Sequence, residues 1–297
     1  MKLLLIYNNF AGNGSATHKL KEVQNTLIKA GITYDLEIPA YQGNGAEIVE
    51  KCKLEEYDGI IAAGGDGTLY EVVNGLFNNP SPNKIPIGIL PIGTGNAFSR
   101  DMDLHVDDWK KSIDIIASKK TKSIDLGKFI TQGKTYYFLN IIGLGFVADV
   151  GATAHKLKFF GNFSYTLGVI YQTLFLKPTP MVIEADGKKI EIKSLFVEVS
   201  NSKYTANFLM APNAKLDDGK FDITIAKPMG RIKLLMSFPK ILTGEHIHME
   251  EVMHFTASNI NITAAIDKIL TPDGELMGST PVEISCLQEK VEIFWPN

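Results

Sequence analysis

Residues 57–77 read YDGIIAAGGDGTLYEVVNGLF and predict a strand, a glycine turn and a helix in direct succession. Residues 58–63 are mostly apolar and end at small residues, which is typical of a buried strand. Over 69–77 the apolar residues recur at helical spacing. Glycines let the backbone approach a ligand closely, and free N–H groups at a helix start attract anions. We therefore expect a phosphate site around Asp66 rather than a simple tight turn, although the Walker A and G-x-G-x-x-G patterns are both absent.

Two more glycine loops follow apolar strands in the first part of the chain. Residues 85–100 read IPIGILPIGTGNAFSR, a predicted strand that ends in a loop with a hydroxyl and an amide side chain. The first predicted strand runs into residues 8–15, NNFAGNGS. Because ligands bind at the carboxyl ends of parallel strands, the loops at 64–68 and 93–96 are expected side by side. Two such loops predict a nucleotide cleft, which the loop at 8–15 would help to close.

The spacing of strands and helices divides the chain into two predicted domains. Over residues 1–124 strands alternate with helices, which predicts an α/β fold with a doubly wound parallel sheet. Residues 125–297 are mainly strands joined by turns, which predicts an antiparallel β-rich domain of the β-sandwich type. A linker is expected at 119–125. The tail at 288–297 belongs either to the second domain or, packed back, to the first.

Individual elements follow from the same patterns. In the first domain, strands are predicted at 2–8, 33–38, 58–63 and 85–90, and helices at 17–30, 45–52, from 69, 97–102 and 107–118. In the second domain, strands are predicted at 136–143, 181–185, 189–200, 221–226 and 259–265, with a hairpin turn at 185–188 and a helical insert between 147 and 176.

Composition restricts the class of function. The net charge of −3 provides no electrostatic footprint for nucleic acid. The two cysteines, Cys52 and Cys286, have the spacing of neither a disulfide framework nor a zinc site, so a reducing cytoplasm is the expected compartment. The apolar run at 3–6 is too short for a signal peptide, and no run approaches the roughly 20 residues that span a bilayer.

Four ordered motifs resemble the diacylglycerol kinase catalytic family, which includes bacterial YegS-like lipid kinases, sphingosine kinases and ceramide kinases. They are GGDGT at 64–68 with EVVNGL at 71–76, LPIGTGN at 90–96, LDDG at 216–219, and DGE at 273–275. Each motif alone is modest, because NAD kinases and phosphofructokinases also carry GGDG-type loops. The resemblance covers essentially the whole chain. It implies an α/β nucleotide domain followed by a β-rich lipid domain, with ATP bound in the cleft between them and phosphate transferred to a diacylglycerol-like hydroxyl.

The resemblance also implies roles for particular residues. Glu275 is expected to be the general base for the lipid hydroxyl, and Asp66 to hold a catalytic Mg²⁺ that bridges ATP oxygens. A second Mg²⁺ is expected at the Asp218 carboxylate and the main-chain carbonyls of Lys215 and Lys220, where a plain hairpin turn is the alternative. Contacts to the nucleotide are expected from Asn9, Gly64, Gly65, Asp66, Gly67, Thr68, Glu71, Gly93, Thr94 and Asn96.

The chain departs from the family pattern at three places. The opening loop lacks its usual proline, Ala97 stands where an Asp is common, and Pro39 stands where some bacterial members have a nucleotide-contacting Thr. A nucleotide- or lipid-binding protein without catalysis therefore remains an alternative. An NAD kinase is a weaker one, because the motifs at 216–219 and 273–275 argue against it. Which lipid is used, whether ATP or GTP is preferred, and whether the chain forms a homodimer are left open.

The remaining signals concern partners. Because the implied substrate is a lipid, peripheral contact with a membrane is expected. The aromatic-rich segment 159–176 fits either a membrane-facing helix or a core helix. His246, His248 and His254 match no standard zinc spacing and are predicted to be exposed polar residues rather than metal ligands.

Overall fold

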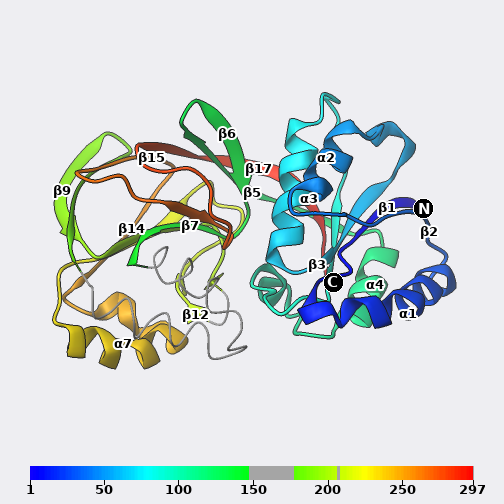
Figure 1. Cartoon of the computed structure of the whole chain (residues 1–297), viewed down its shortest axis with the longest axis horizontal. Helices are drawn as coiled ribbons and strands as arrows, with labels where there is room; N and C mark the ends of the chain where they lie inside the picture. Colours follow the sequence, from blue (N-terminus) through cyan, green and yellow to red (C-terminus); the bar gives the residue numbers. More distant parts are fainter. Residues whose placement is uncertain (147–176, 206–207, 297) are drawn as a thin grey trace. The chain divides into compact units, whose positions relative to one another are not determined.

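The structure, a computed structural model, describes residues 1–146, 177–205 and 208–296, in two compact units. Unit 1 contains Met1–Leu126 and Glu289–Asn297, and unit 2 contains Gly127–Gln288 (Figure 1). The predicted division placed the boundary at 124 and treated 125–297 as one continuous segment. The helical insert predicted between 147 and 176 lies outside the described residues.

Unit 1 is built on a parallel sheet with the strand order β2-β1-β3-β4. Its strands are β1 (Lys2–Tyr7), β2 (Thr33–Glu37), β3 (Gly59–Gly64) and β4 (Ile87–Pro91). The end of β17 (Val282–Phe294) adds to this sheet, with Ile293 in parallel register with Ile87. β3 and β4 are buried along their whole length, which explains why their sequences are continuous apolar runs rather than alternating ones.

The helices of unit 1 form two pairs. They are α1 (Ala16–Lys29), α2 (Asn44–Lys51), α3 (Asp66–Asn78) and α4 (Trp109–Ala117), with short 3₁₀ turns η1 (Gly12–Gly14), η2 (Leu54–Glu56) and η3 (Phe98–Met102). α2 packs on α3 and α1 contacts α4, and Figure 1 shows the pairs on opposite sides of the sheet. The α/β fold with a doubly wound parallel sheet is confirmed. The helix predicted at 97–102 is a 3₁₀ turn, and α3 begins at Asp66, before the predicted start at Leu69.

Unit 2 is an antiparallel β-sandwich, as predicted. One sheet has the order β14-β13-β10-β7-β16, and in the other β17 is followed by β15, β8 and β9. The strands are β5 (Thr121–Thr131), β6 (Lys134–Phe138), β7 (Ile141–Gly145), β8 (Thr179–Ala185), β9 (Lys188–Ser194), β10 (Phe196–Ser200), β13 (Phe221–Ala226), β14 (Val252–Ala257), β15 (Asn259–Ala264) and β16 (Leu270–Pro272). Apolar side chains from both sheets, among them Ile183, Val197 and Ile223, form the core.

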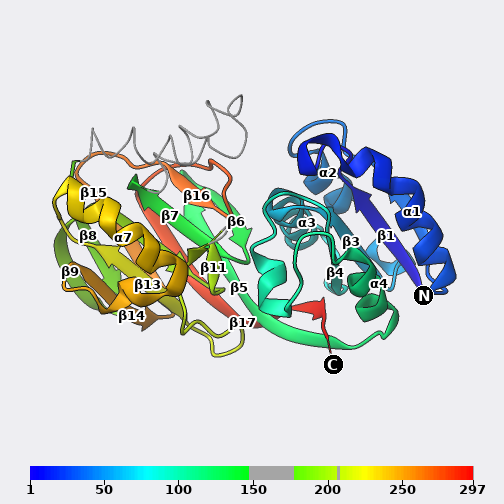
Figure 2. The ribbon, with the colours of Figure 1, turned by 90° about the horizontal axis from the view of Figure 1, so that it is seen from below.

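The outer face of the five-stranded sheet carries a second, smaller core. Phe196 on β10 and Ala226 on β13 alternate with the residues of the sandwich core, so their side chains point to the other face. There they pack with Leu234 of helix α7 (Arg231–Thr243), which Figure 2 shows lying along this sheet. The short hairpin β11 (Tyr204–Thr205) and β12 (Phe208–Leu209) contributes Phe208 to the same core.

Three local predictions are wrong in informative ways. Residues 136–143 and 189–200 each hold two strands rather than one, because the chain turns between β6 and β7 and passes from one sheet to the other between β9 and β10. The burial pattern changes at this switch, because β9 alternates exposed charged residues with half-buried apolar ones and β10 is buried along its whole length. The linker predicted at 119–125 is largely strand β5, which continues from unit 1 into unit 2.

The histidine prediction is wrong for two of the three residues. His246, in the 3₁₀ turn η5 (Glu245–His248), is 2% exposed, and its Nε2 lies 3.0 Å from the carbonyl oxygen of Met210. Burial lowers the pKa of this imidazole. The Nε2 atom of His254 on β14 lies 2.9 Å from the Asp222 carboxylate, and both side chains are mostly buried. No cluster of three metal-ligating side chains exists in the part of the chain that the structure describes.

Candidate functional site

Three loops of unit 1 meet at one edge of its sheet. They follow β1, β3 and β4, which are neighbouring parallel strands, so their carboxyl ends lie together. The loops after β3 and β4 touch through their backbones. A Cβ on Gly93 would lie 2.5 Å from the Cα of Gly65, and a Cβ on Gly65 would lie 2.7 Å from the carbonyl oxygen of Gly95. Only glycine allows this approach, and the expected contact between the two loops is present.

The Asp66 side chain ties these two loops together. Its carboxylate accepts the backbone N–H of Ala97 at 2.8 and 3.0 Å, and that of Phe98 at 3.4 Å, at the start of η3. The N–H of Asp66 donates to the carbonyl oxygen of Gly95 at 3.0 Å. Carboxylate oxygens are also the ligands that Mg²⁺ prefers in proteins. Asp66 therefore holds the two loops together, and it is also the residue that the sequence predicts as a metal ligand.

The start of α3 presents backbone donors at the same edge. Asp66 and Thr68 use their N–H groups within the loops, the latter by donating to the carbonyl oxygen of Gly65 at 3.0 Å. Among the described residues, the N–H groups of Gly65 and Gly67 have no acceptor. Free N–H groups at a helix N-terminus, beside glycines, suit a phosphate group. Thr94 of the neighbouring loop is exposed at this edge.

The Glu71 carboxylate, predicted as a nucleotide contact, binds the backbone of a neighbouring loop. It accepts the N–H of Gly43 at 2.7 Å and the N–H of Gly45 at 2.9 Å, and so holds the loop that begins α2. A Cβ on Gly45 would lie 2.6 Å from the Glu71 Oε2 atom, so the loop fits closely around this side chain. Glu71 therefore positions the surroundings of the site through the 43–45 loop.

The loop after β1 contributes two neighbouring asparagines. Asn8, which the sequence analysis did not select, donates from Nδ2 to the Thr68 hydroxyl at 3.0 Å and accepts the N–H of Phe10 at 2.9 Å. It is the first polar residue after the apolar run of β1, a signal that could have identified it. The Oδ1 atoms of Asn9 and Asn96 are buried and have no hydrogen-bond partner among the described residues. Buried amide oxygens of this kind are typical of a site that binds a ligand or ordered water.

In unit 2, Glu275 follows a tight turn that a second aspartate anchors. Asp273 and Gly274 have positive φ values of 47° and 88°, and the N–H of Glu275 donates to the carbonyl oxygen of Pro272 at 2.8 Å. The Asp273 carboxylate accepts the N–H groups of residues 139–141 at 2.9 to 3.0 Å. The Asp273 side chain is buried, whereas Glu275 is half-buried. This arrangement fixes the backbone from which Glu275 projects.

The predicted metal turn lies between β12 and β13. Lys215, Asp218 and Lys220 are exposed, and the Asp218 carboxylate accepts the N–H of Lys220 at 3.1 Å. Gly219 has a φ of 72°, and its carbonyl oxygen accepts the Ser258 hydroxyl at 2.6 Å. One carboxylate with main-chain carbonyls is an all-oxygen donor set, which suits Mg²⁺ rather than a softer metal. The residues fit the predicted ion, and the same contacts also describe a closed turn.

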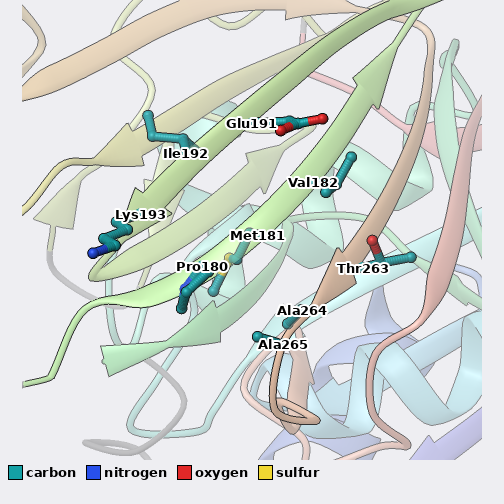
Figure 3. A pocket seen from close by; sticks show the side chains of 9 residues that line it. All are labelled: Pro180, Met181, Val182, Glu191, Ile192, Lys193, Thr263, Ala264 and Ala265. Atoms are coloured by element: carbon teal, nitrogen blue, oxygen red, sulfur yellow. The ribbon is translucent and has the colours of Figure 1, made fainter.

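A cavity of about 470 Å³ lies elsewhere in unit 2. It is lined by residues of β8, β9 and β15, and by Ala265 after β15 (Figure 3). The lining residues are Pro180, Met181, Val182, Glu191, Ile192, Lys193, Thr263, Ala264 and Ala265. None of the predicted site residues lines it, so this cavity is separate from the motifs.

A fully buried carboxyl group in unit 2 was also missed by the sequence analysis. Glu198 on β10 accepts a hydrogen bond from the Thr205 hydroxyl at 2.7 Å. Burial raises the pKa of Glu198 to about 7, and the hydroxyls of Thr205 and Ser200 oppose this rise only in part. Its apolar neighbours along the strand give no sequence signal of an ionisable group at the protein interior.

Comparison with known proteins agrees with the motifs. The model of the diacylglycerol kinase catalytic domain matches residues 2–129, and the model of the YegS C-terminal NAD kinase beta sandwich-like domain matches residues 140–295. The diacylglycerol kinase of Bacillus subtilis (strain 168) is 30% identical over 296 residues, covering 99% of this chain and 96% of that protein. The diacylglycerol kinase of Staphylococcus aureus (strain MRSA252) is 32% identical over 297 residues, covering 99% and 92%.

A solved structure supports the fold along the whole chain. The crystal structure of a putative diacylglycerol kinase from Bacillus anthracis str. Sterne superimposes with a TM-score of 0.80 at 28% identity, covering 99% of this chain and 97% of the other. The match to the catalytic-domain model and to the named relatives defines the class as a kinase. The chain belongs to the diacylglycerol kinase family. The resemblance inferred from the four motifs is confirmed, and membership of a kinase family implies a divalent metal that acts with ATP.

Proposed function

We propose that the chain is an ATP-dependent lipid kinase that transfers the γ-phosphate of ATP to the hydroxyl of a diacylglycerol-like lipid. The observation that carries the proposal is the backbone contact between Gly65 and Gly93, which places two glycine loops together at the start of α3. The free N–H groups of Gly65 and Gly67 are suited to the phosphate oxygens of a nucleotide. Family membership supports phosphoryl transfer over simple nucleotide binding.

Unit 1 would bind and orient the nucleotide. Phosphoryl transfer needs positioning and neutralisation of charge more than covalent chemistry, so loops held rigidly by Asp66 and Glu71 are an advantage. The buried amide oxygens of Asn9 and Asn96 are acceptors for hydroxyl or amino groups of the nucleotide. Asp66 would hold Mg²⁺, which neutralises negative charge on the phosphate oxygens.

Unit 2 would supply the general base and hold the lipid. The Glu275 carboxylate would accept the proton of the lipid hydroxyl as the oxygen of that hydroxyl bonds to the γ-phosphorus, while the bond from that phosphorus to the bridging oxygen breaks and ADP leaves. Asp273 keeps the turn before Glu275 in one conformation through its three backbone hydrogen bonds. A second Mg²⁺ at Asp218 and the carbonyls of Lys215 and Lys220 would stabilise the turn between β12 and β13.

The test is transfer of labelled γ-phosphate from Mg-ATP to lipids in micelles, with Mg-GTP in parallel. The panel contains diacylglycerol, monoacylglycerol, sphingosine, ceramide, phosphatidylglycerol and undecaprenol. We expect labelled diacylglycerol from the wild type. Glu275→Gln is expected to lower the rate by about 10²–10⁴-fold, the usual contribution of a general base, while ATP affinity stays unchanged in calorimetry.

Glu283→Gln is the matched control, because Glu283 is an exposed carboxylate on β17 of the same unit. It is expected to transfer phosphate at the wild-type rate. Unchanged transfer in Glu275→Gln would remove Glu275 from the proposed role. Measurable ATP binding with no labelled lipid under any metal condition would instead favour a binding protein without catalysis.

A further inference from the structure

Helix α7 has two apolar faces, which is unusual for a helix at the surface of a folded unit. Leu234 is buried, and Phe238 and Ile241 pack with it against the outer face of the five-stranded sheet. On the other side, Ile232 and Met236 are 75% and 72% exposed. An amphipathic helix normally exposes polar residues opposite its buried stripe, so this outward apolar face requires an explanation.

The exposed apolar residues form one stripe along the helix. Ile232, Met236 and Pro239 are spaced by four and three residues, which places them on one helical face. With 100° per residue, this face lies opposite Leu234 and Ile241. Leu235 and Leu242, both exposed, lie beside the stripe and widen it. Of the twelve large exposed apolar side chains in the described residues, four belong to this helix.

Basic side chains border the stripe, and the helix contains no acidic residue. Arg231 lies at one border, and Lys233 and Lys240 lie at the other; all three are exposed. Lys233 forms an ion pair with Glu251, which follows the helix in the chain. An apolar stripe with basic borders is the pattern of a helix that lies in the interface of a bilayer, with its cations near anionic headgroups.

We propose that α7 is the membrane-docking element of this protein and inserts Ile232 and Met236 into an anionic lipid surface. The proposal rests on the proposed function, because a lipid substrate has to be taken from a bilayer. The basic borders favour anionic lipid over another protein surface as the occupant of the stripe. The apolar side chains supply the insertion, and Arg231 and Lys240 supply the attraction to negative charge.

Vesicle flotation of the full chain tests the proposal. The probes are vesicles of phosphatidylcholine alone and of phosphatidylcholine mixed with phosphatidylglycerol. The double variant Ile232→Ser, Met236→Ser is expected to lose at least about tenfold in partitioning to the mixed vesicles, since each apolar side chain contributes on the order of tenfold. Ile28→Ser, which removes a 64% exposed side chain from α1 in unit 1, is the matched control and is expected to bind normally.

Two further measurements keep the docking step separate from the chemistry. Arg231→Ser with Lys240→Ser is expected to weaken binding to the mixed vesicles only, and salt is expected to have the same effect on the wild type. Phosphate transfer to a dissolved short-chain diacylglycerol is expected to be equal in the wild type and in the Ile232→Ser, Met236→Ser variant. If no form transfers phosphate, the proposed function fails, and flotation still reports on docking.

Other occupants of the stripe give different results. Wild-type flotation of the Ile232→Ser, Met236→Ser variant would overturn the proposal. A dimer in light scattering that this variant dissociates, without vesicle binding by the wild type, would assign the stripe to a second copy and would also overturn it. A second variant, Met236→Trp, keeps the stripe apolar. The fluorescence of its new tryptophan is expected to be quenched by brominated lipid, and lack of quenching would contradict insertion.

Discussion

Two aspartates, one in each unit, perform the same structural task with different consequences. Asp66 in unit 1 accepts the N–H groups of Ala97 and Phe98 and is partly accessible. Asp273 in unit 2 accepts three N–H groups of residues 139–141 and is buried. A buried carboxylate with all its donors in place is committed to the fold, whereas an accessible one can hold a loop and also bind a ligand. Position in a motif therefore does not by itself separate structural acids from functional ones.

Removal of Asp273 is expected to have the largest effect on stability. In Asp273→Ala three buried N–H groups lose their acceptor, and the free energy of unfolding should fall by about 3–5 kcal/mol. Chemical denaturation measures the change. Asp186→Ala is the control, because Asp186 also accepts backbone N–H groups, from Ser258 and Asn259, in an exposed turn that water can reach. A loss no greater than that of the control, about 1 kcal/mol, would mean that burial adds nothing to the Asp273 anchor.

The buried carboxyl of Glu198 sharpens the contrast with Asp273, because burial raises its pKa to about 7 from 4.5. A pKa raised in the folded state means that the folded protein holds the proton more tightly, so stability is lost as the pH rises from about 4.5 to about 7. The loss should reach at most about 3 kcal/mol. Thermal unfolding of the Glu198→Gln variant, measured between about pH 4.5 and pH 7, should show no such decrease in stability. The same slope in both proteins would assign the pH dependence to other groups, and Glu184→Gln, an exposed carboxylate on β8, serves as the control.

A methyl group at Gly93 is expected to separate the two glycine loops. In Gly93→Ala the new Cβ would lie 2.5 Å from the Cα of Gly65, and overpacking of this kind costs about 2 kcal/mol. Because the loops move apart, ATP affinity in calorimetry should fall together with stability. Gly230→Ala is the control, because Gly230 has no neighbouring atom within 4 Å. Wild-type affinity in Gly93→Ala would show that the close contact is not needed for nucleotide binding.

Asp66→Asn is expected to cost the least stability and to reveal the second role of this residue. The amide retains an oxygen that accepts the N–H of Ala97, so unfolding should change by only about 1 kcal/mol. Loss of a charge beside the phosphates should nevertheless lower lipid phosphorylation by at least about 100-fold. Stability and transfer rate are measured on the same preparation. If both fall only slightly, Asp66 is structural, like Asp273, and the contrast between the two aspartates disappears.

Much of the fold could be predicted because each local pattern agreed with its surroundings. The strand and helix alternation in unit 1 placed β1 to β4 within a few residues, and the Asp186-Gly187 turn marked the β8–β9 hairpin. The patterns failed where the cause lies far away in the chain. Residues 139–140, for example, lie between β6 and β7 and donate their N–H groups to Asp273, which is far away in the sequence.

The candidate site shows the same limit. The contact between the glycine loops could be predicted, because close backbone approach leaves glycine as a direct signal. The hydrogen-bond partners of the Glu71 and Asn8 side chains could not be predicted, because these bonds join segments that are distant in sequence. Glu198 gave no signal at all, because nothing in an apolar strand tells whether its single acid faces water or the interior.

The last strand of the chain has a consequence for how the protein is made. Phe294 on β17 is buried in unit 1, where it lies against Gly59 and Gly88, and the N–H of Trp295 donates to the carbonyl oxygen of Lys120 at 2.9 Å. Domains usually fold on the ribosome in the order in which they are synthesised. Here most of unit 1 is synthesised first, but residues 289–296 are needed to complete its sheet. Unit 1 therefore cannot finish folding until all of unit 2 has been translated. A ribosome stalled within unit 2 would carry an incomplete unit 1 with the edge of β4 uncovered.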